Sequence, residues 1–384
     1  MKTWGLVLAC TLLAACASAP TPVPPPERLF DDALFAPAGE RISADDVFAL
    51  SEPMRRFLKN ELVGEVRSKG LQQGLVDALQ HRGKLRLEYD SSTTRTASQA
   101  FEARSGNCLS LVLMTAALAK ELGLPVHYQS VFVDTTWSRS GDLYFSSGHI
   151  NLTLGARLLD SRMGYGATPP LTIDFLPPEE LRGQRSRSIG EDTVIAMYMN
   201  NHAAELLSRG RLDDAYWWAR QAIVQSPTFM SAYNTLGVIY LRHGNVREAE
   251  QSLRSLLERE PANTAAMSNL ARVLETMGRT AEAQEWTRKL AQIEAYPPFH
   301  FFDRGIAAML AGDYKTARDL FKKEIDRAAY YHEFHFWLAI AESRLGDVKE
   351  ARRHLAIAIE NSTTRSDHDL YAAKLDWLKA HRVQ

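Results

Sequence analysis

A fixed spacing of glycines in the C-terminal half of the chain constrains the fold more than any other feature. Five glycines follow one another at intervals of 34 residues, and an alanine stands five residues after each of them. The glycines are Gly210, Gly244, Gly278, Gly312 and Gly346, and the alanines are Ala215, Ala249, Ala283, Ala317 and Ala351. A strict period of this length is typical of stacked pairs of antiparallel helices, in which glycine forms the turn and alanine packs where two helices cross. The period predicts an all-α solenoid of five units over residues 196–365.

The second unit carries the residues of a known repeat. Tyr233, Leu236, Gly237 and Tyr240 have the spacing of the tetratricopeptide repeat, with tyrosine at the first position instead of the usual tryptophan. The array therefore resembles tetratricopeptide repeats, and this resemblance implies a concave groove that binds a protein or a peptide. Residues 366–384 carry apolar side chains at helical spacing, and we expect them to form a helix that caps the last unit.

We expect the first helix of each unit to line this groove. The positions that we infer to point inward are polar in the first three units and apolar in the fourth. They are Asn200, Asn234, Val238, Arg242, Arg272 and Glu275, followed by Phe299, Phe302, Ile306, Met309 and Leu310. The apolar positions have an alternative role, because an apolar stripe at helical spacing can equally pack against a neighbouring helix.

The first residues have the pattern of an export signal. Lys2 is positive, and the apolar stretch from Leu6 to Ala15 is too short to span a bilayer. The stretch ends in Leu-Ala-Ala before Cys16 and resembles the lipobox of bacterial lipoproteins. This resemblance implies that residues 1–15 are a signal peptide and that Cys16 carries lipid. An ordinary secretory signal, cut between Ala17 and Ala19, is the alternative.

Residues 16–27 form a Pro-rich linker after the lipidated cysteine. A polyproline segment is stiff, so the linker would hold the folded part away from the membrane. Ala17 stands where an aspartate would retain an enterobacterial lipoprotein in the inner membrane. By this resemblance we expect a lipid-anchored protein on the periplasmic side of the outer membrane.

The composition excludes several classes of protein. The 384 residues carry 45 basic and 46 acidic side chains, whereas a nucleic-acid binder usually has a basic excess. Three cysteines are too few for a disulfide-stapled scaffold or a multi-cysteine zinc module. His332 and His335 stand one helical turn apart without an evident third ligand, so we expect them to pack or to lie on the surface. We therefore expect no nucleic-acid partner, no metal and no other cofactor.

Residues 28–192 lack the 34-residue period and mix helix and strand patterns. Cys108 precedes the apolar helix Leu109 to Leu122, so it lies in the first turn of a buried helix. Free N–H groups and the helix dipole stabilise a thiolate there, and they can also receive an oxyanion. His149 opens a strand, and Asp160 ends the next one after a tight turn. The turn would bring Asp160 level with His149, where a carboxylate can orient the imidazole toward the thiol.

This order of residues resembles the transglutaminase-like, papain-like superfamily over about residues 85–180. The resemblance implies an α+β domain in which Cys108 is the nucleophile, His149 the general base and acid, and Asp160 the orienting group. It also implies acyl transfer at amides, although some members of the superfamily are inactive. The chain departs from the pattern at Asn151, where tryptophan is frequent, and after Asp160, where proline is frequent. Asp174 is therefore a rival third member.

Two functions are compatible with this sequence. The first is a membrane-anchored periplasmic enzyme that transfers acyl groups through a thioester on Cys108, with repeats that bind a protein or peptide. Hydrolysis and transamidation differ only in the acceptor, so the residues do not separate them. The second is a non-catalytic scaffold or assembly factor that acts through the repeats alone, with Cys108 as a small buried hydrophobe. A free thiol in an oxidising compartment favours the first.

Overall fold

The computed structural model describes residues 26–80, 87–90, 93–140, 143–155, 169–175, 185–362 and 365–380. Within these ranges no helix is both long enough and apolar enough to cross a bilayer. The expected signal peptide of residues 1–15, Cys16, most of the Pro-rich linker and Asp160 lie outside the described residues.

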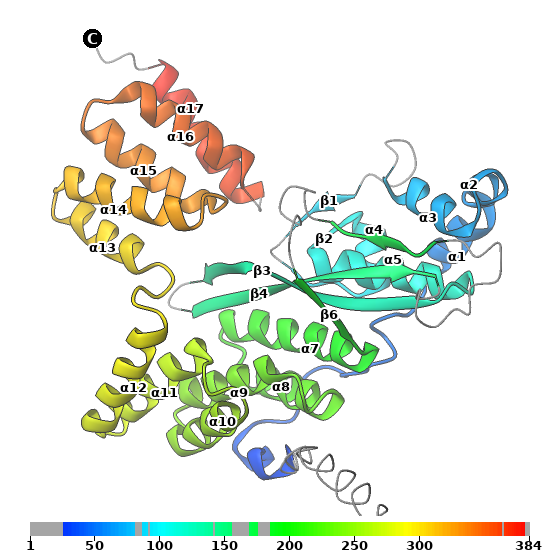
Figure 1. Ribbon diagram of the computed structural model, residues 1–384, viewed down its shortest axis with the longest axis horizontal. Helices are drawn as coiled ribbons and strands as arrows, with labels where there is room; N and C mark the ends of the chain where they lie inside the picture. The colour runs from blue at the N-terminus through cyan, green and yellow to red at the C-terminus, as the bar shows by residue number, and fades with distance from the viewer. Residues whose placement is uncertain are drawn as a thin grey trace, which may run out of the picture.

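The N-terminal half combines helices with a small antiparallel sheet (Figure 1). Its helices are α1 (Glu52–Asn60), α2 (Val63–Lys69), α3 (Leu71–Gln80), α4 (Ala97–Ala103) and α5 (Cys108–Glu121). The four-stranded sheet has the order β5 (Leu171–Ile173), β4 (Leu143–Leu154), β3 (Val126–Ser140) and β6 (Arg185–Ile189). A separate parallel pair joins β1 (Glu88–Tyr89) to β2 (Ser105–Gly106). Strands and helices thus occur together in this half, as an α+β domain requires.

Helix α5 is the central helix of this half. Its residues from Leu109 to Ala119 are all buried, and the helix packs against β4. A helix that is apolar on every side is stable only inside a core. Asn107 caps its first turn, because the Asn107 side chain accepts a hydrogen bond from the Ser110 backbone N–H at 2.9 Å. The cap and the buried body fix the position of Cys108, the first residue of the helix.

The C-terminal half is built only of helices. They are α7 (Glu191–Ser208), α8 (Leu212–Gln225), α9 (Met230–His243), α10 (Val246–Arg259), α11 (Thr264–Thr276), α12 (Thr280–Ile293), α13 (His300–Leu310), α14 (Tyr314–Arg327), α15 (His332–Arg344), α16 (Val348–Glu360) and α17 (Arg365–Ala380). All five periodic glycines have a positive φ, between 73° and 92°, in the turns between paired helices. Such backbone favours glycine, and this explains the 34-residue period. The structure confirms the predicted helical solenoid.

The small residues of the repeats allow the paired helices to touch. A Cβ atom on Gly237 of α9 would lie 2.8 Å from Cγ of Leu253 on α10. On Gly305 of α13 it would lie 2.5 Å from the ring of Phe321 on α14. Real Cβ atoms do not approach other carbons this closely, so a larger residue would force the helices apart.

The solenoid is divided into two parts. One continuous core extends from Phe35 through α5 and on to Ala283 in α12, whereas α13 to α17 are packed around two separate cores. The break follows α12, where Pro297 and Pro298 precede α13 and Phe299 adopts a φ of 64°. Figure 1 shows α12 and α13 joined by an irregular segment. The period of 34 residues continues across the break, so the sequence alone does not reveal it.

A segment near the N-terminus, residues 28–40, lies along α8, α9 and α10, and we call it the strap. The ring of Phe35 stacks on Tyr216 with centroids 3.9 Å apart. Tyr240 donates its hydroxyl to the carbonyl of Leu29 at 2.9 Å, and Trp217 donates its indole N–H to the carbonyl of Ala36 at 2.7 Å. The strap therefore ties the N-terminal region to the first two repeats through backbone groups and one aromatic anchor.

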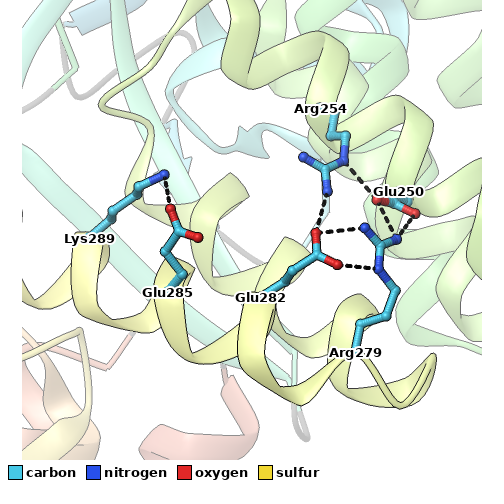
Figure 2. A network of polar contacts seen from close by, with 6 residues as sticks. All are labelled: Glu250, Arg254, Arg279, Glu282, Glu285 and Lys289. Carbon is cyan, nitrogen blue, oxygen red and sulfur yellow. Dashed lines mark hydrogen bonds and ion pairs between the residues drawn. The ribbon is translucent and has the colours of Figure 1, made fainter.

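Charged residues join the second and third repeats (Figure 2). Arg279, just before α12, donates from Nη1 to both carboxylate oxygens of Glu250 on α10, at 2.8 and 2.7 Å. It also donates from Nε to Glu282 at 2.6 Å, and Arg254 completes the cluster beside Glu250. Single surface ion pairs contribute little, but a shared network of this kind holds two units in register.

Candidate functional site

Cys108 occupies the site that the sequence predicts for a nucleophile. It is a free, half-buried cysteine at the first position of α5. Asn107 caps the helix just before it, so Cys108 lies in the first turn, at the positive end of the helix dipole. The arrangement is one that can stabilise negative charge on sulfur or on a substrate oxygen.

His149 lies on β4, is 4% exposed and interacts with Cys108. Its Nε2 atom is 2.7 Å from Oδ1 of Asp174, so Nδ1 is the ring nitrogen left for the thiol. Asp174 directly follows β5, and the pairing of Leu152 with Ile173 brings it alongside β4. The structure thus places the rival carboxylate, Asp174, against the imidazole.

Asn151 holds the other oxygen of the same carboxylate. Its side-chain amide donates to Oδ2 of Asp174 at 2.8 Å, and the residue is 7% exposed. His149 and Asn151 are two positions apart on β4, so both point to the same face of the sheet. Asn151, where the sequence departs from the expected pattern, therefore takes part in the polar cluster.

The electrostatics of the cluster favour a charged imidazole. Burial lowers the pKa of His149, but the hydrogen bonds to Asp174 and Cys108 and the charges of both groups outweigh it. The pKa of His149 is raised to about 9. An imidazolium at neutral pH beside a thiol is the arrangement that activates a cysteine nucleophile.

The polar residues expected in the repeat groove have different environments. Arg242 on α9 and Arg272 on α11 are exposed. Asn234 is half-buried and accepts a hydrogen bond from the Asn269 amide at 2.9 Å. Asn200 on α7 is 9% exposed, and its Oδ1 atom is buried without a hydrogen-bond partner among the described residues. Of these four polar positions, the two that are exposed are therefore the arginines on α9 and α11.

Phe299 and Phe302 do not line a groove, which corrects the expectation that they bind a partner. They are 2% and 0% exposed and pack with Phe334 in the core shared by α13, α14 and α15. The physical reason is the break before α13, since these rings fill the interior of a separate module. The alternative that apolar residues at helical spacing form core is correct here.

The two histidines of α15 contact different partners. His332 lies 2.7 Å from the hydroxyl of Tyr371, and His335 is hydrogen-bonded to His354 through the two Nδ1 atoms at 2.9 Å. Glu342 is buried near this pair, and its Oε2 atom has no hydrogen-bond partner within the described ranges. In the described part of the chain, no group of three or more His, Cys, Asp or Glu residues is placed to hold a metal ion.

Sequence reasoning missed a buried polar network beside Cys108. Thr94 accepts hydrogen bonds from the side chains of Asn107 and Asn201, and its backbone N–H donates to Glu205 of α7. Thr94 lies in the segment that precedes α4. Its partners on α7 are more than 100 residues away, so no local pattern indicates them.

Comparison with known proteins identifies the repeats. Two family models, both described as tetratricopeptide repeat, match residues 240–295 and 302–365. The chain is 28% identical over 146 residues to a probable assembly chaperone of rpl4 from Emericella nidulans, and the match covers 37% of this chain and 36% of that protein. It is 30% identical over 102 residues to tetratricopeptide repeat protein 7B from Homo sapiens, over 27% of this chain and 12% of that protein. The chain thus spans a minor part of both relatives.

Two solved structures also match part of the chain. TTC0263, a thermophilic TPR protein from Thermus thermophilus, is 19% identical, with a TM-score of 0.31, over 47% of this chain and 99% of that chain. The pilF protein of Pseudomonas aeruginosa is 17% identical, with a TM-score of 0.31, over 49% of this chain and 85% of that chain. The matches by family models establish that the C-terminal half of this chain contains tetratricopeptide repeats.

Proposed function

We propose that this protein is a scaffold that binds a protein or peptide partner through its tetratricopeptide repeats. The observation that carries the proposal is the exposed polar surface of α9 and α11, which includes Arg242 and Arg272, within an array that two repeat models match. The similarity to a probable assembly chaperone supports a role in binding another protein. The first helices of stacked repeats form the concave surface that such proteins use.

A binding experiment tests this proposal. A library of immobilised random peptides is screened for those that bind the full chain. Fluorescence anisotropy then gives the Kd of each selected peptide. Arg242→Glu and Arg272→Glu should each weaken binding by about tenfold, because the charge that faces the ligand is reversed. Arg247→Glu is the matched control, since it makes the same charge change at an exposed position on α10. Equal effects of all three variants would contradict binding on α9 and α11.

A second function is supported by one specific observation, the 2.7 Å hydrogen bond of His149 to Asp174 in a cluster where Cys108 also raises the pKa of the imidazole. We propose that a transglutaminase-like thiol site transfers acyl groups at amides. In this scheme the proton of the Cys108 thiol already rests on His149, whose pKa of about 9 keeps it charged at neutral pH, and the thiolate sulfur attacks the amide carbonyl. The carbon–nitrogen bond then breaks, His149 protonates the departing amine, and a thioester remains. Water or a second amine accepts the acyl group and frees the thiol.

Alkylation of the thiol tests this second function without a known substrate. Iodoacetamide should modify Cys108 faster than a free cysteine peptide at pH 7, and His149→Ala should slow the reaction by at least about tenfold. Peptide mass spectrometry separates Cys108 from Cys10 and Cys16. A rate equal to that of the free peptide, unchanged in His149→Ala, would refute the proposed chemistry while leaving the scaffold function intact.

The location is proposed from the sequence. A lipid at Cys16 would anchor the protein at the periplasmic side of the outer membrane. Metabolic labelling with a palmitate analogue tests it, because the wild type should incorporate the label and Cys16→Ser should not. Labelling that persists in Cys16→Ser would contradict the anchor.

A further inference from the structure

Thr94 is the centre of a polar network that reaches the residue before Cys108. The residue is 4% exposed, and its hydroxyl oxygen accepts from the side-chain amide of Asn107 at 2.9 Å. Asn107 in turn accepts hydrogen bonds from the backbone N–H and the hydroxyl of Ser110, at 2.9 and 2.8 Å. The amide of Asn107 is thus fixed at both ends, and its orientation sets the cap of α5 and the position of Cys108.

The same threonine is held by the first helix of the repeat array. Glu205 of α7 accepts a hydrogen bond from the Thr94 backbone N–H at 2.6 Å, and Asn201 of α7 donates to the Thr94 hydroxyl at 3.3 Å. A hydrogen bond to a carboxylate is among the stronger ones in proteins. The network therefore continues from α7, through Thr94 and Asn107, to the first turn of α5.

The other end of α7 is fixed to the same domain. Glu191, at the start of α7, is ion-paired with Lys120 near the end of α5. It also accepts a hydrogen bond from the hydroxyl of Tyr128 on β3 at 3.0 Å. Because α7 is tied both near the start and near the end of α5, it contributes to the thiol domain as well as to the repeats.

We propose that α7 is a structural part of the thiol site, in which Glu205 and Thr94 are positioning residues for Cys108 at the start of α5. This inference rests on the proposed thiol chemistry and assigns the first repeat a role in it. Thr94 and Glu205 do not touch a substrate in this scheme. They act through Asn107, whose cap holds the thiol at the helix start and opposite His149.

Conservative and disruptive variants at the same positions test the proposal on the full chain. Thr94→Val has nearly the same shape but no hydroxyl, whereas Thr94→Ser keeps it. Glu205→Leu removes the acceptor for the Thr94 N–H, whereas Glu205→Gln keeps a side-chain oxygen. The readout is the rate of iodoacetamide modification of Cys108 between pH 5 and 10, resolved by peptide mass spectrometry.

We expect Thr94→Val and Glu205→Leu to slow the modification at pH 7 by about fivefold to tenfold, the equivalent of one buried hydrogen bond. We also expect their pH profiles to shift, and Thr94→Ser and Glu205→Gln to stay within about twofold of the wild type. A change in stability alone would alter melting temperatures without moving the pH profile. If Thr94→Val does not fold, the modification rate of Glu205→Leu tests the proposal.

The outcomes separate this inference from the function on which it rests. Suppose that His149→Ala slows the modification of Cys108, but Thr94→Val and Glu205→Leu react at the wild-type rate. This result overturns the positioning role and leaves the proposed thiol chemistry intact. If Cys108 of the wild type reacts at the rate of a free cysteine peptide, and His149→Ala does not change this rate, both the positioning role and the thiol chemistry are overturned. Slowing by Thr94→Val with recovery in Thr94→Ser supports the inference.

Discussion

Replacing Asp174 by asparagine tests which carboxylate orients His149. Asp174→Asn keeps the size of the side chain but removes the negative charge 2.7 Å from Nε2 of the imidazole. The charge and hydrogen bonds of Asp174 and Cys108 raise the pKa of His149 to about 9, against the effect of burial. Without the carboxylate, burial opposes the charged imidazole with only the thiol to offset it.

The expected size of the effect follows from this balance. The ordinary pKa of histidine is 6.5, and that of His149 in the folded protein is about 9. We expect Asp174→Asn to lower the pKa of His149 by about 2 pH units, which corresponds to about 3 kcal/mol. Because the folded pKa is raised, the stability that the charged imidazole contributes is complete below pH 6.5 and is lost as the pH rises through about 9. The wild type should therefore exceed the variant in stability below pH 6.5, and the difference should shrink toward pH 9.

Nuclear magnetic resonance gives the pKa directly. The ring signals of the eleven histidines are titrated in the full chain, and His149→Gln identifies the signal of His149. Asp160→Asn is the matched control, since it makes the same chemical change at the carboxylate that the sequence favours. Urea denaturation at pH 6 and pH 9 measures the stability of the same proteins.

Two results would refute this reasoning. One is a His149 signal that titrates at the same pH in Asp174→Asn and in the wild type. The other is a shift as large in Asp160→Asn as in Asp174→Asn. The first would mean that the hydrogen bond to Asp174 does not control the charge of the imidazole, and the second that Asp174 controls it no more than Asp160 does.

Three further predictions concern stability. Phe35→Ala removes a buried ring that stacks on Tyr216. It should lower the free energy of unfolding, measured by urea denaturation, by about 3 kcal/mol. A loss below about 1 kcal/mol would contradict the role of the strap as an anchor. Gly237→Ala places a Cβ 2.8 Å from Leu253 and should cost about 1–3 kcal/mol, seen as a lower Tm; an unchanged Tm would argue against the close packing of α9 on α10. Burial raises the pKa of Glu342 from 4.5 to about 7, so the wild type should lose stability between these pH values as its unfolded state ionises first. Glu342→Gln should therefore gain up to about 3 kcal/mol relative to the wild type above pH 7, and a difference that is the same at pH 5 and pH 8 in melting curves would count against this.

Local patterns in the sequence are sufficient for the helices of the repeats. The turn at each periodic glycine depends on a few neighbouring residues, and this is why the predicted solenoid is confirmed. The same approach failed for Phe299 and Phe302, because their exposure depends on how α13 packs after the break. A stripe of apolar residues has the same spacing whether it faces a groove or a core.

The sequence by itself determined the 34-residue repeat and pointed to Cys108 and His149 from local patterns, although β4 begins at Leu143, so that His149 lies within the strand and does not open it. Only the tertiary structure decided that Asp174 meets His149, because this contact depends on β5 pairing with β4. The packing of the strap on the repeats likewise depends on tertiary structure, and so does the network from α7 through Thr94 to the start of α5. The contacts of the strap with the repeats and of Thr94 with α7 join residues more than 100 positions apart, and their energy comes from burial and hydrogen bonds that form only when the chain is folded.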